Sequence, residues 1–259
     1  PMVIEIWNLV FIQYNRKADR SLEELPEKHI DTGMGFERLC MAIQGKHSNY
    51  DTDVFSSYIS YIEEKSGIKY QGKYENAPMS DIAMRVLVDH LRAVSFTIAD
   101  GELPSNTGAG YVIRRILRRA VRYYYSFLNI QEPFLHSMVG MLAKQFKSVF
   151  HELEAQVGFV SKVILEEEKS FLRTLEGGLR RIDTLELTDH NLDGRQAFEL
   201  YDTYGFPIDL TRLIAAEKGW TIDEPGFEAA LAEQKDRSRA DAKRETGDWI
   251  SVSDDNSVE

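Results

Sequence analysis

The first part of the chain has the hydrophobic pattern of β-strands. Residues 3–14 are rich in β-branched and aromatic side chains, which predicts one or two strands buried on at least one face. A polar loop follows, and residues 22–30 predict a returning extended segment. Gly33 and Gly35 then suit a tight turn, and apolar side chains from Leu39 onward recur at helical spacing. The pattern therefore predicts the order strand, loop, strand, turn and helix.

From residue 51 onward the pattern becomes almost wholly helical. Six segments carry apolar side chains at a spacing of about 3.6 residues. These segments are residues 53–64, 84–99, 111–125, 134–150, 152–175 and 227–243. A polar, turn-rich stretch at residues 72–78 has the composition of a linker, and the acidic residues 251–259 have that of a disordered tail. We therefore expect an α+β protein that is predominantly α.

Composition excludes several classes of protein. The 259 residues are 43% hydrophobic and 28% charged, which is too apolar for a disordered chain and sufficient to bury a core. The single cysteine, Cys40, excludes an internal disulfide and cannot make a zinc site by itself. The chain has neither an apolar run long enough to cross a membrane nor the start of a secretory signal. We therefore expect a cytoplasmic protein with no membrane partner.

The negative net charge hides one basic region. The whole chain has a net charge of −11, but residues 101–150 carry seven basic and two acidic side chains, a net charge of +5. Five of these basic side chains fall on one half of a predicted helix, and apolar side chains occupy the other half. The five are Arg114, Arg115, Arg118, Arg119 and Arg122.

This arginine face favours an anionic partner. Like charges one turn apart repel each other, so helix stability alone does not explain five arginines. Guanidinium groups match phosphate oxygens through paired hydrogen bonds, which favours RNA or another phosphate ligand. The alternative is that acidic side chains of residues 151–259 neutralise this face from within the protein. We favour RNA.

Other segments carry weaker signals. Asn106, in a loop of small residues, offers both a donor and an acceptor to a base edge. Asp31, beside two glycines, could hold an ammonium group, although the favoured interpretation of these residues by themselves is a simple turn. The aromatic side chains of residues 201–207 suit a core, and Asp202 among them could cap a helix. The acidic run 166–168 has the composition of a solvated helix face, and the six histidines show no metal-ligand spacing.

Seven short motifs occur along the chain in a fixed order. They are residues 5–11 (EIWNLVF), 31–38 (DTGMGFER), 48–53 (SNYDTD), 89–92 (DHLR), 104–106 (PSN), 110–115 (GYVIRR) and 201–207 (YDTYGFP). Together they span nearly the whole chain and resemble the alanyl-tRNA synthetases. Each motif alone is a weak signal, but seven motifs in the family's order are specific.

The resemblance implies a class II synthetase architecture. Residues 1–75 would form the C-terminal part of an antiparallel-sheet catalytic domain, with the third class II motif, a strand running into a helix, at residues 31–45. Residues 76–250 would form a helical tRNA-recognition domain. The implied activity is that of an alanine–tRNA ligase, which uses ATP and Mg²⁺ to activate alanine as alanyl-adenylate and transfers it to the 3′ end of tRNA(Ala).

The resemblance also implies roles for particular residues of the first part. Asn8, Val10, Asp31 and Gly33 would line a small alanine pocket, with the Asp31 carboxylate holding the substrate ammonium. Such a pocket admits glycine and separates alanine from serine only modestly, because one methyl group offers little to recognise. Arg38 would bind the phosphates of ATP.

In the helical part the resemblance implies an RNA site. Asn106 and Asp202 would read the G·U wobble pair in the acceptor stem of tRNA(Ala), and the five arginines would bind the same RNA. The minor groove of A-form RNA is wide and shallow, so such side chains reach its base edges.

Several parts of the family pattern do not occur in this sequence. The first class II motif and most of the second would precede residue 1, and the editing domain, the oligomerisation region and most zinc ligands would follow residue 259. We therefore expect a fragment that does not aminoacylate by itself, holds no zinc, and works with an N-terminal catalytic part and an editing domain. The alternatives are a non-catalytic RNA-binding module and a fragment without an independent role.

Overall fold

The protein is described here by a computed structural model that covers residues 3–187 and 189–242, with the backbone alone over 238–242. The chain divides into two compact units, Pro1–Lys169 and Ser170–Glu259. The functional boundary expected after residue 75 therefore falls inside the first unit. The expected disordered tail, residues 251–259, lies outside the described residues.

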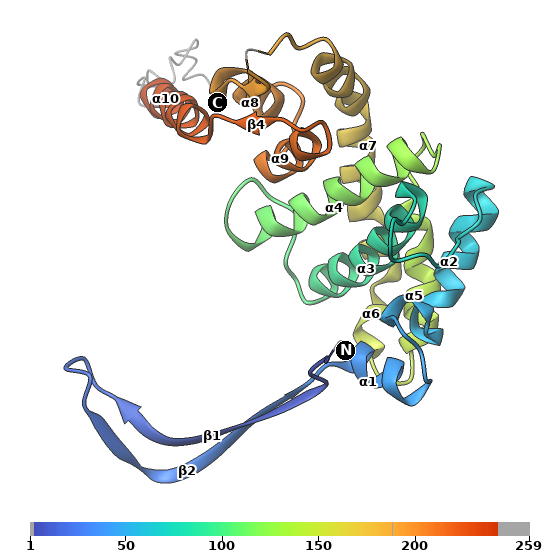
Figure 1. Cartoon of the computed structure of the whole chain (residues 1–259), viewed down its shortest axis with the longest axis vertical. Helices are drawn as coiled ribbons and strands as arrows, with labels where there is room; N and C mark the ends of the chain where they lie inside the picture. The colour runs from blue at the N-terminus through green and yellow to red at the C-terminus, as the bar shows by residue number, and fades with distance from the viewer. Residues whose placement is uncertain (1–2, 188, 243–259) are drawn as a thin grey trace, which may run out of the picture. The chain divides into compact units, whose positions relative to one another are not determined.

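The chain begins with a long antiparallel hairpin, seen as a curved two-stranded ribbon in Figure 1. Strand β1 (Trp7–Arg16) pairs with strand β2 (Leu22–Met34), and the register shifts once, between Ile12 and Tyr14. Helix α1 (Phe36–Ile43) follows directly. The predicted order of strand, loop, strand and helix is confirmed.

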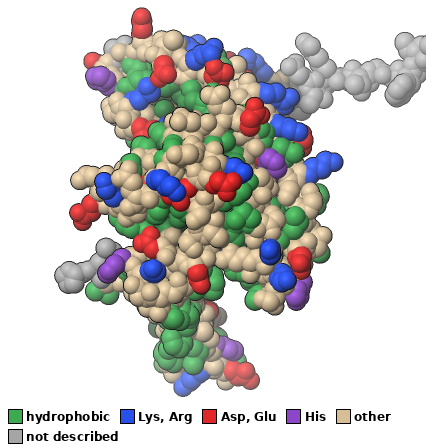
Figure 2. Space-filling view, turned by 90° about the vertical axis from the view of Figure 1, so that its right-hand side faces the viewer, with side chains coloured by type: hydrophobic (Ala, Val, Ile, Leu, Met, Phe, Trp, Pro, Cys, Tyr) green, Lys and Arg blue, Asp and Glu red, His purple; other side chains and the backbone are tan. Residues whose placement is uncertain are grey.

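The prediction of a buried face on the first strand was wrong. Trp7, Val10 and Phe11 are 55%, 49% and 71% exposed. Trp7 and Phe11 lie on one face of the hairpin and Val10 lies on the other, so neither face is buried. Figure 2 shows hydrophobic side chains gathered on this hairpin at the bottom of the view. Consecutive apolar residues are typical of a strand covered on both faces, and a sheet of two strands leaves both faces open.

The prediction of a tight turn at the two glycines was also wrong. Residues 31–34 belong to β2, and Gly35 caps α1 in an extended conformation with φ −73°. Neither glycine has a positive φ. A Cβ at Gly35 would lie 3.2 Å from Cδ of Arg38, so the missing side chain makes room for that arginine.

Helices form the remainder of the first unit. They are η1 (Asn49–Asp51), α2 (Asp53–Ser66), α3 (Met79–Ala99), α4 (Gly108–Phe127), η2 (Leu135–Met138), α5 (Val139–Phe146), α6 (His151–Ala155) and the first half of α7 (Val157–Asp183). The predicted helix 134–150 is divided into η2 and α5, and the predicted helix 152–175 is divided at Gln156. Fully buried apolar side chains from α2, α3 and α4, including Ile62, Leu91 and Leu117, form the core. The predominantly helical α+β class is confirmed.

An arginine of α3 holds α1 against these helices. Arg92 makes an ion pair with Glu37 of α1, and its guanidinium lies 5.3 to 5.8 Å from the ring centres of Phe36, Phe55 and Phe146. Two of the seven sequence motifs, residues 31–38 and 89–92, are thus joined in space.

Residues 72–78 are not a free linker. The fully buried carboxylate of Asp81 accepts hydrogen bonds from the backbone N–H groups of Gln71 and Lys73, both at 3.0 Å. Arg85 donates to the Lys73 carbonyl and lies 4.0 Å from the ring centre of Tyr74. Composition gave no sign of this buried aspartate, which fastens the segment to α3.

The second unit contains the end of α7, three further helices and a two-stranded parallel sheet. The helices are α8 (Gly194–Asp202), α9 (Ile208–Glu217) and α10 (Glu224–Ala242), and the strands are β3 (Asn191–Leu192) and β4 (Thr221–Ile222). Helices α8 and α10 approach closely, because a Cβ at Gly194 would lie 2.5 Å from Cα of Gly226. Sequence periodicity predicted α10 but neither α8, α9 nor the short strands.

Candidate substrate and RNA sites

The hairpin register brings together the four residues expected to bind alanine. Asn8 lies opposite Gly33, and Val10 lies opposite Asp31. Residues opposite each other in an antiparallel pair share a face, and so do alternate residues of one strand. All four positions therefore lie on one face of the hairpin. A Cβ at Gly33 would lie 3.8 Å from Oδ1 of Asn8, so a larger side chain would fill the space beside Asn8.

The carboxylate of Asp31 is available to a ligand. It is exposed and makes no hydrogen bond or ion pair with any described residue. Asn8 uses one amide N–H for the Glu5 carboxylate, at 3.3 Å. The described residues form one open face here, whereas the expectation was a small enclosed pocket.

Arg38 lies at the base of the same hairpin. Its Nη1 donates to the carbonyl oxygen of Glu5 at 2.8 Å, and the nearby Gly35 N–H donates to Ile6 at 3.0 Å. Among the described residues, the Glu5 carbonyl is the single acceptor of an Arg38 hydrogen bond. The other guanidinium N–H groups can therefore meet an anion such as a phosphate.

The arginine face of α4 is partly neutralised from within the protein. Arg114 and Arg118 both pair with Glu167 of α7, at 2.7 Å and 3.7 Å. Their side chains are only 18% and 16% exposed. The alternative of internal neutralisation therefore holds for these two arginines. Figure 2 likewise shows basic and acidic side chains next to one another on the helical part of the molecule.

The other three arginines differ among themselves. Arg122 is 5% exposed, and its guanidinium lies 4.7 Å from the ring centre of Phe127. Arg119 is half-buried over Tyr123, at 5.9 Å, and has no ion pair with any residue that the structure describes. Arg115 is half-buried as well. Of the five arginines, Arg119 is therefore the best placed to bind an external phosphate.

The acidic run 166–168 is not a solvated face. Glu166 is exposed, but Glu167 is 15% exposed and Glu168 is fully buried. Glu168 accepts hydrogen bonds from the Tyr124 hydroxyl and from the backbone N–H groups at the start of η2. Its Oε2 also lies 2.9 Å from Nδ1 of His136.

One signal in the sequence could have identified Glu168. Ile164, Phe171 and Leu175 are fully or almost fully buried, and Glu168 shares their helical spacing on α7. Burial, and secondarily the charge of Glu168, raise the pKa of Tyr124 far above its ordinary value. The Tyr124 hydroxyl therefore remains protonated and donates to Glu168.

Asn106 lies in a loop that folds back on the start of α4. The Ser105 N–H donates to the Gly110 carbonyl at 3.0 Å, and the Ser105 hydroxyl donates to the Thr107 carbonyl at 2.6 Å. Asn106 is exposed, and its Oδ1 accepts a hydrogen bond from Nη1 of Arg114. The loop approaches the helix so closely that a Cβ at Gly110 would lie 2.5 Å from Oγ of Ser105 and would overlap the Leu103 carbonyl.

Gly110→Ala is therefore expected to destabilise the protein by about 1–3 kcal/mol, the usual effect of an overpacked site. Urea unfolding measures this change. The matched control is Gly140→Ala in α5, where an added Cβ meets nothing within 4 Å and helix propensity favours alanine. Equal stability of the two variants would contradict the close packing of the loop on α4.

Asp202 lies at the C-terminal end of α8, whereas an N-cap lies at the N-terminal end of a helix. It is the last residue of α8, where Thr203 is the C-cap, so the helix-cap interpretation was wrong. Its exposed carboxylate accepts a hydrogen bond from Gln234 at 3.1 Å. A negative charge at the C-terminus of a helix is disfavoured by the helix dipole. Its position therefore offers no evident gain in stability.

The motif around Asp202 separates aromatic side chains from polar ones. Phe206 is fully buried, with its ring centre 5.6 Å from that of Phe171. A Cβ at Gly178 would lie 2.8 Å from Cζ of Phe206, so this glycine of α7 makes room for the ring. The buried ring of Phe206 therefore anchors this motif to α7, while Asp202 remains exposed. Asn106 lies in the first unit and Asp202 in the second.

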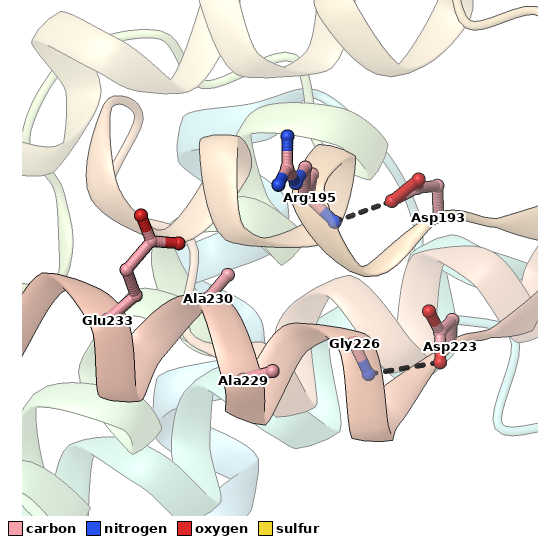
Figure 3. Close-up of a pocket in the computed structure, with 7 residues that line it drawn as sticks. All are labelled: Asp193, Arg195, Asp223, Gly226, Ala229, Ala230 and Glu233. Atoms are coloured by element: carbon pink, nitrogen blue, oxygen red, sulfur yellow. Dashed lines mark hydrogen bonds between the residues drawn. The ribbon is translucent and has the colours of Figure 1, made fainter.

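A cavity of about 270 Å³ lies between the start of α8 and α10 (Figure 3). Asp193 and Asp223 line it, but each accepts a hydrogen bond from a backbone N–H at the start of a helix, that of Arg195 and that of Gly226. Ala229 and Ala230 of α10 also line it. The two aspartates serve as helix caps, which explains their presence without a ligand.

Within residues 3–187 and 189–242, no three histidine, cysteine or acidic side chains gather as metal ligands would. None of the helices described combines the length and apolar character needed to span a bilayer.

Comparison with known proteins identifies the family. The family model described as "tRNA synthetases class II (A)" matches residues 1–258, and the chain belongs to this family. Curated relatives named alanine–tRNA ligase are 61% identical over 264 residues in Cytophaga hutchinsonii, 59% over 254 in Christiangramia forsetii and 57% over 256 in Flavobacterium psychrophilum. These alignments cover 100%, 97% and 96% of this chain but only 30%, 29% and 29% of the relatives. The chain thus spans less than a third of their length.

Proposed function

We propose that the chain is part of an alanine–tRNA ligase, which activates alanine with ATP as alanyl-adenylate and transfers it to the 3′ end of tRNA(Ala). The hairpin register carries this proposal, because it gathers Asn8, Val10, Asp31 and Gly33 on one face. The names of the similar proteins support the same activity. The protein works in the cytoplasm and binds no membrane.

The hairpin face suits alanine. The unpartnered carboxylate of Asp31 holds the α-ammonium group through a charge-assisted hydrogen bond. Gly33 leaves space beside Asn8 for a small substrate, and Val10 offers an apolar contact to the methyl group. Arg38 contacts the phosphates of ATP with the N–H groups that it does not use on Glu5. Bound Mg²⁺ would neutralise those phosphates while the chain's own residues orient the two substrates.

The helical part suits the tRNA acceptor stem. The exposed amide of Asn106, in the first unit, offers a donor and an acceptor to a base edge, and the exposed carboxylate of Asp202, in the second unit, offers acceptors. The exocyclic amino group of guanine is a hydrogen-bond donor in the minor groove, and a carboxylate can accept a hydrogen bond from it. Arg119 contacts the phosphate backbone, with Arg115 beside it. We assign residues 1–75 to alanine and ATP and residues 76–250 to RNA, since the proposed residues divide in this way.

Amino-acid-dependent exchange of pyrophosphate into ATP tests the activity in the complete protein that contains this chain. We expect exchange with alanine, weaker exchange with glycine and serine, and none with large amino acids such as leucine, because one methyl group is all that the site recognises. Exchange driven best by another amino acid would contradict the proposal. RNA binding without any exchange would favour the alternative, a non-catalytic RNA-binding module.

A further inference from the structure

The guanidinium of Arg114 is already occupied within the protein. Nη1 donates to Oδ1 of Asn106, Nη2 donates to Glu167 at 2.7 Å, and Nε is buried. The side chains of Arg114 and Glu167 are 18% and 15% exposed. Both Nη atoms of this guanidinium therefore donate within the protein, whereas Nε is buried without a hydrogen-bond partner among the described residues.

The contact with Arg114 also fixes which way the Asn106 amide faces. The oxygen and nitrogen of an asparagine amide are commonly interchangeable by a flip of the group. An arginine has donors only, so the asparagine atom that faces it must be the oxygen. The amide nitrogen Nδ2 then makes no hydrogen bond with any described residue, and the side chain as a whole is exposed.

We propose that Glu167 and Arg114 act in series as positioning residues for Asn106, so that its Nδ2 donates to an acceptor atom on the RNA base edge. The inference rests on the proposed RNA function and deepens it. Glu167 of α7 holds Arg114 of α4, and Arg114 holds the amide of the preceding loop. The loop backbone is fixed separately, by the Ser105 hydrogen bonds and by close packing on Gly110.

Positioning has a different signature from a phosphate contact. A phosphate contact strengthens binding to every RNA duplex and adds to its dependence on salt. A positioning residue affects only the discrimination that its partner performs. Arg114 should therefore influence the preference for a G·U stem over a G·C stem, and it should do so only when Asn106 is present.

The test measures the Kd of the chain for two acceptor-stem duplexes that differ only in a G·U or G·C pair, at two salt concentrations. Arg114→Met keeps the aliphatic stem but removes every donor. We expect it to lower the G·U preference about tenfold, within the usual coupling of residues in one hydrogen-bond network, and to leave the salt dependence unchanged. In the Asn106→Ala background it should change the preference no further.

Two matched variants complete the design. Glu167→Gln should lower the same preference in the same direction but less, because a neutral amide still accepts from Arg114. It also keeps the test decisive if Arg114→Met does not fold. Arg119→Met, on the same helix, should weaken binding to both stems alike and reduce the salt dependence.

The outcomes separate the two hypotheses. If Arg114→Met weakens both stems equally, or lowers the preference as much without Asn106 as with it, positioning is overturned while base reading stands. If Asn106→Ala itself leaves the preference intact, base reading by Asn106 fails and the positioning proposal fails with it.

Discussion

Asp31→Ala in the complete protein is expected to lower the efficiency of alanine activation about 30- to 150-fold, the loss that corresponds to about 2–3 kcal/mol for a hydrogen bond to a charged group. The substitution removes the carboxylate that faces the substrate ammonium in our account, while RNA binding should change little. Pyrophosphate exchange at several alanine concentrations measures the effect.

Glu27→Ala is the matched control for this prediction. Glu27 is an exposed carboxylate on the same strand, four residues from Asp31, in the stretch of β2 where the register of the hairpin shifts. It should leave alanine activation within about twofold, since a distant surface charge contributes little. If Asp31→Ala also stays within about threefold, Asp31 does not hold the ammonium.

Glu168→Ala is expected to destabilise the protein by about 3–5 kcal/mol, because it removes one buried acceptor that several donors share, and each buried donor left unsatisfied costs about 1–3 kcal/mol. The substitution leaves the Tyr124 hydroxyl and the N–H groups of Phe134 and Leu135 without their acceptor in a buried site. Urea unfolding and melting curves measure the loss.

Glu166→Ala, two residues earlier, controls for the loss of an acidic side chain from the same helix. Glu166 is exposed and pairs with Lys169 at the surface, at 3.3 Å, so its removal should change stability by less than about 0.5 kcal/mol. Equal stability of the two variants would contradict the buried role of Glu168.

The sequence predicts the order of the hairpin and α1 well, because β-branched and aromatic runs and helical spacing are local signals. Burial of the hairpin is not local. Val10 and Phe11 have the side chains of a covered strand, yet both are exposed in the part of the chain described. The prediction of a turn at Gly33 was wrong for a related reason. The sequence does not distinguish a glycine that leaves space for a neighbour from a glycine that bends the chain.

Charge was the least reliable guide. Side-chain type cannot distinguish the buried Glu168 from the exposed Glu166, and only the apolar spacing of α7 separates them. The five arginines form one face of a helix, but Glu167, which pairs with Arg114 and Arg118, comes from a helix some fifty residues later. Such partners become visible only when the tertiary structure brings the helices together.

The motifs in the sequence indicated the candidate site residues, and the structure then showed which of these residues share a face. Opposite pairing puts Asp31 and Val10 on the face of Asn8 and Gly33, a relation that no spacing along the sequence contains. The division of the chain after Lys169 was not predictable from composition, because it falls inside the continuous helix α7.

The Kd of the chain for the two acceptor-stem duplexes tests whether Asn106 and Asp202 read the G·U pair. We expect the unaltered chain to prefer the G·U stem, and we expect Asn106→Ala or Asp202→Ala each to remove about 1–3 kcal/mol of that preference. Arg119→Ala should instead weaken both stems alike. Equal losses on both stems for Asn106→Ala and Asp202→Ala, with the G·U preference intact, would contradict the account.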